Sequence, residues 1–195
     1  MIQAPPVILA SGSPRRQELL AAMGIIFSVV LKEVDETFPE HLRREEVALY
    51  LAEKKSASYK TEAAEGNLVI TADTIVCLEE QIIGKPEGFE EGFEMLKLLS
   101  GKRHEVITGV TLRTNDTTVS FFDTTNVYFK PLTSKEITFY LKTCSPYDKA
   151  GSYGIQDWIG YIGVEKIEGS YQNVMGLPVQ KLYAELIKLH FEWQP

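Results

Sequence analysis

The stretch Leu9-Ala10-Ser11-Gly12-Ser13-Pro14-Arg15-Arg16 decides the fold, because it joins the end of an apolar strand to the start of a helix. The strand end is the apolar run Val7-Ile8-Leu9. Ser13 suits the N-cap, and Pro14 suits the first helical position, where its missing N–H would have had no partner. A strand, a tight turn and a helix in this order open a βα unit and predict an α/β protein.

Arg15 and Arg16 both fall in the first turn of this helix. The N-terminus of a helix is already positive, so each cation there is unfavourable by a few tenths of a kcal/mol to about 1 kcal/mol. Two arginines beside unpartnered backbone N–H groups are consistent with an anion that binds at this point. The alternative is a pair of solvated arginines on an ordinary helix.

Length and composition limit the class of protein. A chain of 195 residues fits one domain over residues 1–195, or two small lobes, with a sizeable core. Hydrophobic residues make up 44% and charged residues 24%, as in ordinary globular proteins. There is no apolar run of membrane-spanning length and no signal-peptide pattern, so we expect a cytoplasmic protein without a membrane partner.

The net charge and the placement of cysteine and histidine exclude further classes of partner and of metal site. The formal net charge of −7 argues against a nucleic-acid partner and requires a local Lys/Arg cluster for any anionic substrate. Cys77 and Cys144 form no CxxC motif, so we expect reduced thiols. His41, His104 and His190 lack metal-ligand spacing, so we expect no zinc site.

The periodicity of the apolar residues and the positions of turn residues predict strands that alternate with helices along the chain. Expected strands cover residues 25–31, 68–78, 82–86 and 161–167, and a hairpin pairs 104–113 with 119–130. Expected helices cover residues 14–23, 44–63, 89–99, 137–142 and 177–191. The segment Thr133-Ser134-Lys135-Glu136 is a capping box. Together these elements predict the α/β class, with a mixed twisted sheet and flanking helices.

Asp73 lies in the middle of the long apolar strand 68–78. A carboxylate there costs several kcal/mol of desolvation unless it is paired, bound to a metal or open to a cleft. One interpretation is a buried aspartate that accepts backbone hydrogen bonds. We favour a functional site, because charged residues in such surroundings often mark one.

Several charged residues lie at predicted strand ends and helix starts, which converge on one crevice in an open α/β sheet. The cations are Arg15, Arg16, Lys55 and Lys85, and the carboxylates are Glu36 and Asp73. Lys54 and Lys55 are adjacent in one helix, so one of them should face the body of the protein. Lys85 has the alternative of an ordinary surface lysine. Cations suit a polyphosphate, and paired carboxylates suit Mg²⁺.

Common phosphate and hydrolase motifs are missing from the sequence. It has neither GxxxxGK[ST] nor GxGxxG, so it matches neither a P-loop nor a dinucleotide-binding fingerprint. It also lacks GxSxG, and no histidine stands in a motif that would activate Ser11 or Ser13 as a nucleophile. The residues alone therefore indicate a metal-assisted enzyme acting on phosphate esters or phosphoanhydrides.

The opening segment Ser11-Gly12-Ser13-Pro14-Arg15-Arg16 resembles the first motif of the Maf family of septum-formation-inhibitor-like nucleoside triphosphate pyrophosphatases. Further similar motifs follow in the family's order: Val34-Asp35-Glu36, Leu51-Ala52-Glu53-Lys54-Lys55, Ala72-Asp73-Thr74, Gly84-Lys85-Pro86, Ser100-Gly101-Lys102-Arg103-His104, Thr125-Asn126-Val127-Tyr128-Phe129, Asp148-Lys149-Ala150-Gly151-Ser152-Tyr153-Gly154-Ile155-Gln156 and Gly176-Leu177-Pro178. Each motif alone is weak, whereas the ordered set spans nearly the whole chain and is specific.

The resemblance implies hydrolysis of a nucleoside triphosphate to the monophosphate and pyrophosphate. It also implies an elongated, two-lobed fold similar to inosine triphosphate pyrophosphatase with a central cleft, a divalent cation (Mg²⁺, or Mn²⁺) and a possible homodimer. Asp73 matches the family's proton acceptor, and Asp73 with Glu36 would hold the metal. The other matching cleft residues are Ser11, Arg16, Glu36, Lys55 and Lys85.

Three further positions match the subfamily that acts on dTTP and UTP, namely Arg15, Thr74 and Gln156. An amide has a donor and an acceptor, so Gln156 would complement O4 and N3–H of uracil or thymine. The alternative for Gln156 is an amide that stabilises its loop. Two segments depart from the family pattern: Thr143-Cys144-Ser145-Pro146, where many relatives carry a glutamate, and Asp157-Trp158, where a glycine commonly follows the glutamine.

Two other functions remain as alternatives to a dTTP/UTP pyrophosphatase. One is a nucleotide-binding regulator of septum formation or cell division without relevant turnover. The other is a purine house-cleaning pyrophosphatase of the inosine triphosphate type. The residues Glu36, Asp73 and Lys85 argue against the first of these, because a regulator without turnover does not need them.

Overall fold

The computed structural model describes residues 5–191, which form two compact units. The first unit contains residues 5–73, Thr108–Asp123 and 176–191. The second unit contains Thr74–Ile107 and Thr124–Met175.

The first unit opens with parallel strands, as the N-terminal stretch predicts. Strand β1 (Val7–Leu9) pairs in parallel with β2 (Phe27–Val29) on one side and with β3 (Leu68–Leu78) on the other. Helix α1 (Pro14–Ala22) connects β1 to β2, and Gly24 follows it with a φ of 75°. A positive φ suits glycine, so the predicted C-terminal stop of this helix is confirmed.

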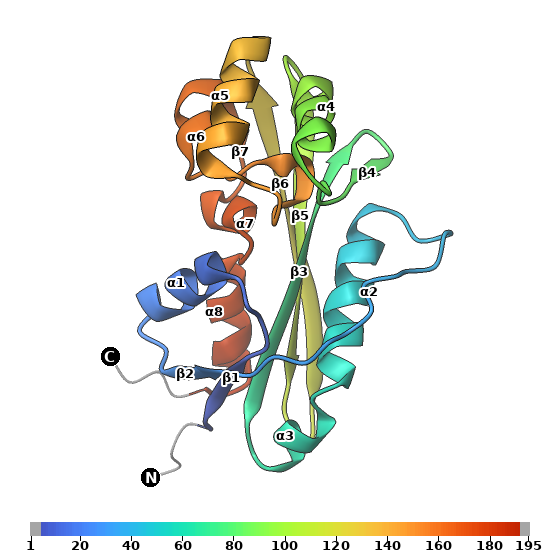
Figure 1. Cartoon of the computed structure of the whole chain (residues 1–195). Helices are drawn as coiled ribbons and strands as arrows, with labels where there is room; N and C mark the ends of the chain where they lie inside the picture. The colour runs from blue at the N-terminus through green and yellow to red at the C-terminus, as the bar shows by residue number, and fades with distance from the viewer. Residues whose placement is uncertain (1–4, 192–195) are drawn as a thin grey trace. The chain divides into compact units, whose positions relative to one another are not determined.

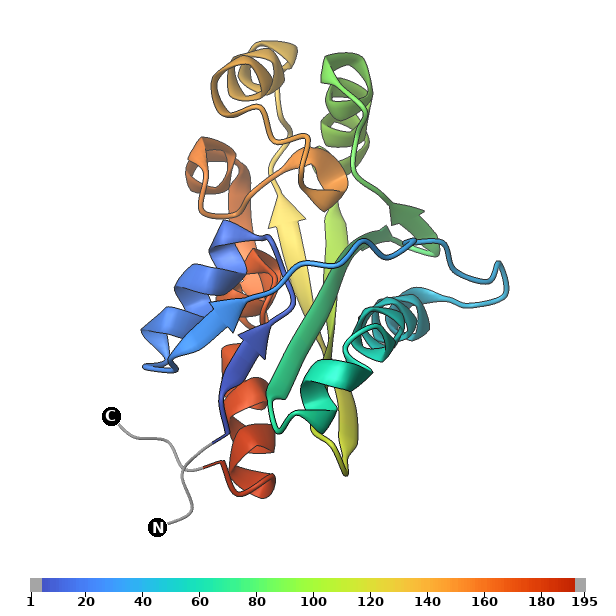
Figure 2. The same ribbon diagram turned by 60° about the horizontal axis from the view of Figure 1, so that its bottom comes forward.

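Helices cover both faces of the sheet in the first unit (Figures 1 and 2). Helix α2 (Arg44–Ala57) lies on one face and α8 (Val179–Lys188) on the other. Helix α2 lies very close to the sheet at Gly109. A Cβ at that position would lie 2.3 Å from the carbonyl oxygen of Ala48 in α2. Lys181 of α8 donates to the Phe122 carbonyl at 3.1 Å and ties that helix to the sheet.

The second unit packs helices and strands around its own core. Its elements include β4 (Gln81–Ile83), α4 (Phe89–Leu99), α5 (Ser134–Cys144), the 3₁₀ turn η1 (Ala150–Ser152), α6 (Trp158–Gly163), β7 (Val164–Glu168) and α7 (Tyr171–Met175). Helices α4 and α5 lie side by side (Figures 1 and 2). The buried core beneath them includes Leu96, Leu99, Phe129, Tyr140 and Ile159.

Among residues 5–191 the strands pair in the order β2-β1-β3-β5-β6-β7, with β4 beside β3. Strands β5 (Arg103–Arg113) and β6 (Thr118–Phe129) are the two arms of the predicted hairpin. Thr114 N–H donates to the Thr117 carbonyl at 2.9 Å and closes the turn between them. Parallel pairs at β1 and antiparallel pairs at β4 and β7 make the sheet mixed, so the predicted fold class is confirmed.

Three predicted elements in the first half of the chain have different bounds. The strand predicted over 82–86 is β4, which begins at Gln81 and ends at Ile83. The strand predicted over 25–31 is the shorter β2, and the helix predicted over 44–63 is two helices, α2 and α3 (Lys60–Ala64). The helix is interrupted at Tyr59, which is only 2% exposed and donates its hydroxyl to the Val30 carbonyl at 2.9 Å. Packing of this buried side chain overrides local helical periodicity.

Two more predictions fail near the C-terminus. The strand predicted over 161–167 is wrong for its first three residues, which belong to α6, and β7 begins only at Val164. A short apolar run cannot be assigned to helix or strand by periodicity alone. The last helix is α8 rather than 177–191, and the short α7 was not predicted.

The prediction that Cys77 and Cys144 are free thiols is confirmed.

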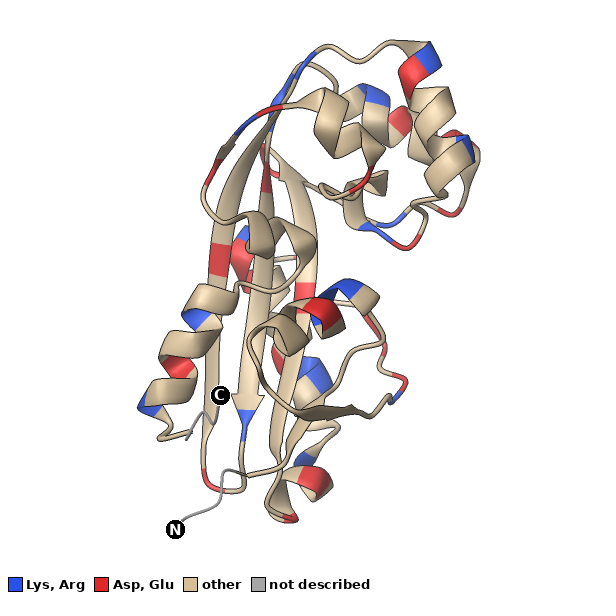
Figure 3. Ribbon diagram, turned by 90° about the vertical axis from the view of Figure 1, so that its left-hand side faces the viewer, with Lys and Arg blue, Asp and Glu red and all other residues tan. Residues whose placement is uncertain are grey.

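Basic and acidic residues are interspersed along the helices and loops of each unit, whereas most of the length of the long strands carries neither (Figure 3). This matches strands whose side chains are largely buried, such as β3 and β5. Within residues 5–191, every helix is too short or too polar to cross a bilayer.

Candidate active site

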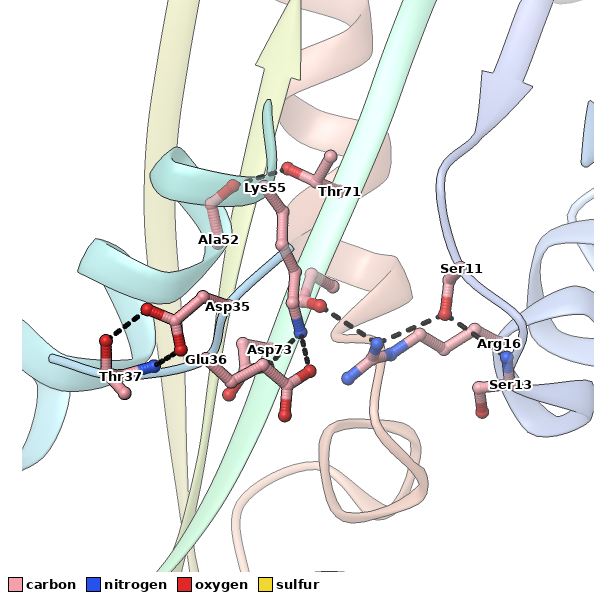
Figure 4. Close-up of polar contacts among 11 residues, drawn as sticks. Ser11, Ser13, Arg16, Asp35, Glu36, Thr37, Ala52, Lys55, Thr71 and Asp73 are labelled. Atoms are coloured by element: carbon pink, nitrogen blue, oxygen red, sulfur yellow. Dashed lines mark hydrogen bonds and ion pairs between the residues drawn. The ribbon is translucent and has the colours of Figure 1, made fainter. Parts of the chain in front are cut away.

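A carboxylate–ammonium–carboxylate cluster lies beside β3 in the first unit, with Asp73 on the strand, Lys55 on α2 and Glu36 on the loop before α2 (Figure 4). Asp73 is 8% exposed, and its Oδ1 contacts Nζ of Lys55. The same Nζ lies 2.7 Å from Oε1 of Glu36. The predicted buried carboxylate is therefore paired, and a second carboxylate shares its partner.

The two adjacent lysines of α2 point in different directions, as predicted. Successive residues of a helix are rotated by about 100° from each other. Lys55 turns toward the strand and its side chain is 16% exposed. Lys54 turns to the loop before α2, where it donates to Oδ2 of Asp35 at 3.1 Å and to the Thr37 carbonyl at 2.8 Å.

The loop that carries Glu36 is held on both sides of that residue. Thr37 N–H donates to Oδ1 of Asp35 at 3.0 Å, and the Thr37 hydroxyl donates to the same carboxylate (Figure 4). These bonds, together with Lys54, lower the pKa of Asp35 to about 2. The sequence interpretation missed Asp35 and Lys54 as loop anchors. The signal was present, because Asp-x-Thr is a spacing at which an aspartate can bond the backbone two residues on.

Arg16 is fixed beside the same strand by neutral acceptors. Its Nε donates to the Gly176 carbonyl at 2.8 Å, and its Nη1 donates to the Ala72 carbonyl at 2.9 Å and to Oγ of Ser11 at 3.2 Å. Burial lowers the pKa of the Arg16 guanidinium, while the charge of Asp73 opposes that shift. An arginine remains charged regardless, so Arg16 is an anchored cation close to the cluster.

Ser11 acts here as an acceptor. Its Oγ also receives a bond from Ser13 N–H at 3.3 Å, and the residue is 8% exposed. Ser13 occupies the predicted N-cap and Pro14 the first turn, but within the described chain the Ser13 side chain makes no capping bond. Arg15 lies about 100° around the helix from Arg16, and its charge lowers the pKa of Arg16. The two arginines therefore occupy different surroundings.

Three predicted residues belong to the second unit. Thr74 is half-buried on β3, and Lys85 is exposed in the segment after β4. Gln156 lies in the loop between η1 and α6, where its Nε2 donates to Oδ1 of Asp157 at 3.1 Å. Their position beside the cluster of the first unit stays a prediction. The structure brings together Ser11, Arg16, Glu36, Lys55 and Asp73, all in the first unit.

The solved structures reveal a fold relative. The chain is similar to the Ham1 protein of Staphylococcus aureus, with a TM-score of 0.53 at 16% identity, over 94% of this chain and 99% of that one. This likeness shows a shared fold. The family model described as Maf-like protein matches residues 6–189.

The chain belongs to the Maf family. Relatives of high identity span almost the same length. A dTTP/UTP pyrophosphatase of Phocaeicola vulgatus is 52% identical over 184 residues, which is 94% of this chain and 95% of that protein. Proteins of the same name from Bacteroides thetaiotaomicron and Parabacteroides distasonis are 50% and 51% identical, over 94% and 92% of this chain and 95% and 94% of theirs.

In this Maf-family chain the charged cluster also shows which residues could hold a metal. The carboxylates of Glu36 and Asp73 already converge on one cation, the ammonium of Lys55. Carboxylate oxygens are the ligands that Mg²⁺ prefers, and Mg²⁺ usually takes only one or two of them beside water and phosphate oxygens. Among residues 5–191 there is no group of three or more His, Cys, Asp and Glu that could form an all-protein cage. The donor set fits a cation shared with a phosphate ligand.

Proposed function

We propose that this chain is a nucleoside triphosphate pyrophosphatase that hydrolyses dTTP and UTP to the monophosphate and pyrophosphate. The observation that carries the proposal is the cluster in which Glu36 and Asp73 share Lys55 beside the anchored Arg16. Relatives about 50% identical over nearly the whole chain are named for this reaction. The pyrimidine preference also draws on Arg15, Thr74 and Gln156.

The cations would act through position and charge. Arg16 is held by two backbone carbonyls, so its charge needs no rearrangement when a phosphate oxygen arrives. Such preorganised charge stabilises the negative charge that develops in the transition state. Lys55 and Lys85 would neutralise charge on the departing pyrophosphate. Ser11 keeps the Arg16 guanidinium oriented.

The carboxylates would direct the attacking water. Asp73 can accept a proton from a water that attacks the α-phosphorus, or it can join Glu36 in holding Mg²⁺ or Mn²⁺. Such a cation polarises phosphate oxygens and lowers the pKa of bound water. Either role requires the charge of Asp73, while Lys55 compensates the two carboxylates when no cation is bound.

The decisive experiment measures pyrophosphate release from dTTP, UTP, CTP, ITP and dATP and compares kcat/KM. We expect dTTP and UTP to be preferred. A preference for ITP would favour the purine house-cleaning alternative, and binding of dTTP without pyrophosphate release would favour the regulator. Asp73→Asn should lower kcat by about 10²- to 10⁴-fold, with nearly unchanged thermal unfolding, and wild-type turnover in this variant would contradict the proposed site.

Metal dependence is tested on the same protein. We expect EDTA to abolish activity and added Mg²⁺ or Mn²⁺ to restore it. Glu36→Gln should raise the Mg²⁺ concentration needed for half-maximal activity. Unchanged activity of the wild type in EDTA would contradict the requirement for a divalent cation. The proposal includes a cytoplasmic location, where nucleoside triphosphates are found, and a homodimer, which light scattering in solution would test.

A further inference from the structure

A network of polar side chains surrounds Gln156 in the second unit. Nε2 of Gln156 donates to Oδ1 of Asp157 at 3.1 Å, and the Tyr140 hydroxyl donates to Oδ2 of the same carboxylate at 2.9 Å. The Tyr140 oxygen in turn accepts from Gly154 N–H at 3.0 Å. Asp157 therefore accepts from an amide at one oxygen and from a hydroxyl at the other, and Nζ of Lys149 lies 4.0 Å from Oδ2.

The side chain of Asp157 does not make the helix-capping bond that is usual at its position. Asp157 occupies the N-cap of α6, where an aspartate ordinarily accepts from the first backbone N–H groups. Within residues 5–191 it makes no such capping bond. Gly154 leaves the space that this arrangement needs, because a Cβ there would lie 2.5 Å from Oδ2 of Asp157 and 2.8 Å from Nε2 of Gln156. The loop is built for contact between these two side chains.

The carboxylate dictates which way the Gln156 amide points. A carboxylate has only acceptor atoms, so the amide nitrogen, and not its oxygen, must face Asp157. Tyr140 reinforces this, because burial raises the pKa of its hydroxyl and keeps it a donor. Oε1 of Gln156 is buried and has no hydrogen-bond partner among the described residues. The network leaves one amide acceptor and one remaining N–H of fixed orientation.

We propose that Asp157 is a positioning residue that fixes the orientation of the Gln156 amide and thereby selects uracil and thymine over cytosine. The inference rests on the proposed function and deepens it. Uracil and thymine present an acceptor at O4 and a donor at N3, whereas cytosine presents a donor at N4 and an acceptor at N3. The fixed amide matches the first pair, and an amide turned by 180° matches the second.

The test compares kcat/KM for UTP and CTP, measured as pyrophosphate release by the full-length protein. In Asp157→Asn the new amide can meet Gln156 through its oxygen or its nitrogen, so both orientations of Gln156 become available. We expect the UTP-to-CTP ratio to fall about tenfold, the size of effect expected from one or two hydrogen bonds. Asp157→Gly removes the partner altogether and should also lower the ratio. A ratio is independent of the folded fraction, so partial misfolding cannot imitate this result.

The matched control is Asp148→Asn, the same charge change in the segment between α5 and η1. Asp148 pairs with Lys149 at 2.7 Å, and its side chain is 58% exposed. We expect its UTP-to-CTP ratio to stay at the wild-type value. An unchanged ratio in both Asp157 variants, or an equal fall in the control, would overturn the inference while the proposed function stands. A wild-type protein that releases no pyrophosphate from UTP would overturn both.

Discussion

His104 makes acid stability a quantitative test of the second unit. Its side chain is fully buried, and its Nε2 lies 2.8 Å from the Tyr153 hydroxyl. Its ring meets Phe129 and Tyr153 edge to face, with centroids 5.0 and 5.4 Å away. Burial among these rings lowers the pKa of His104 from 6.5 to about 4. The imidazole is neutral in the folded protein at physiological pH.

The sign and size of the effect follow from that shift. Between pH 6.5 and 4 the unfolded chain binds a proton that the folded chain rejects, so the free energy of unfolding falls as the pH falls. A shift of one pKa unit corresponds to 1.36 kcal/mol, so His104 removes about 3 kcal/mol below pH 4 and about 2 kcal/mol by pH 5. The contribution is fully present above pH 7.

Urea unfolding of the wild type and of His104→Phe, at pH 7, 6, 5 and 4.5, measures this contribution. The phenyl ring keeps the aromatic packing but leaves the Tyr153 hydroxyl without its partner, which lowers stability by about 1–3 kcal/mol at every pH. The wild type should therefore lose about 2 kcal/mol more than the variant between pH 7 and 5. Parallel curves for the two proteins would refute the reasoning, as would an NMR titration of His104 with a midpoint near 6.5.

Three further changes test packing, capping and the loop before α2. Gly109→Ala should lower the free energy of unfolding by about 1–3 kcal/mol, because its Cβ would overlap the Ala48 carbonyl; Gly84→Ala, whose Cβ meets nothing within 4 Å among the described residues, should leave the melting temperature nearly unchanged. Thr133→Ala removes the side-chain bond that caps α5, so we expect a loss of about 1 kcal/mol in urea unfolding. Lys54→Met releases the loop that carries a site carboxylate, and kcat/KM for UTP should fall by about two- to fivefold without a change in melting temperature.

Short sequence patterns predicted the fold well wherever neighbouring residues determine the local structure. The N-terminal βα unit follows from the apolar run 7–9 and from Pro14, and the helix α5 follows from its capping box at Thr133. The failures lie where distant packing decides. Tyr59 enters the core and interrupts a periodic helix, and the apolar run after Trp158 is helical although its composition suits a strand.

The candidate site also has a part that was predictable from the sequence and a part that was not. Asp73 was predictable because an isolated carboxylate in an apolar strand needs a partner, and Lys55 because only one of two adjacent lysines can face inward. The supporting contacts that join residues far apart in the sequence were not predictable. Arg16 donates to a carbonyl 160 residues away, and the partnership of Asp157 with Tyr140 spans 17 residues and two helices. No local pattern encodes such a pair.

The charges of the first unit give an independent argument for a divalent cation. Arg16 and Lys55 contribute two positive charges, and Glu36 and Asp73 contribute two negative ones, so this cluster is neutral as a whole. A triphosphate carries several negative charges, and the protein's net charge of −7 repels it. Arg16 and Lys55 therefore do not suffice by themselves. A divalent cation on the two carboxylates would release Lys55 from both of them for the phosphates and turn a neutral cluster into a positive one, which is what a polyphosphate substrate requires.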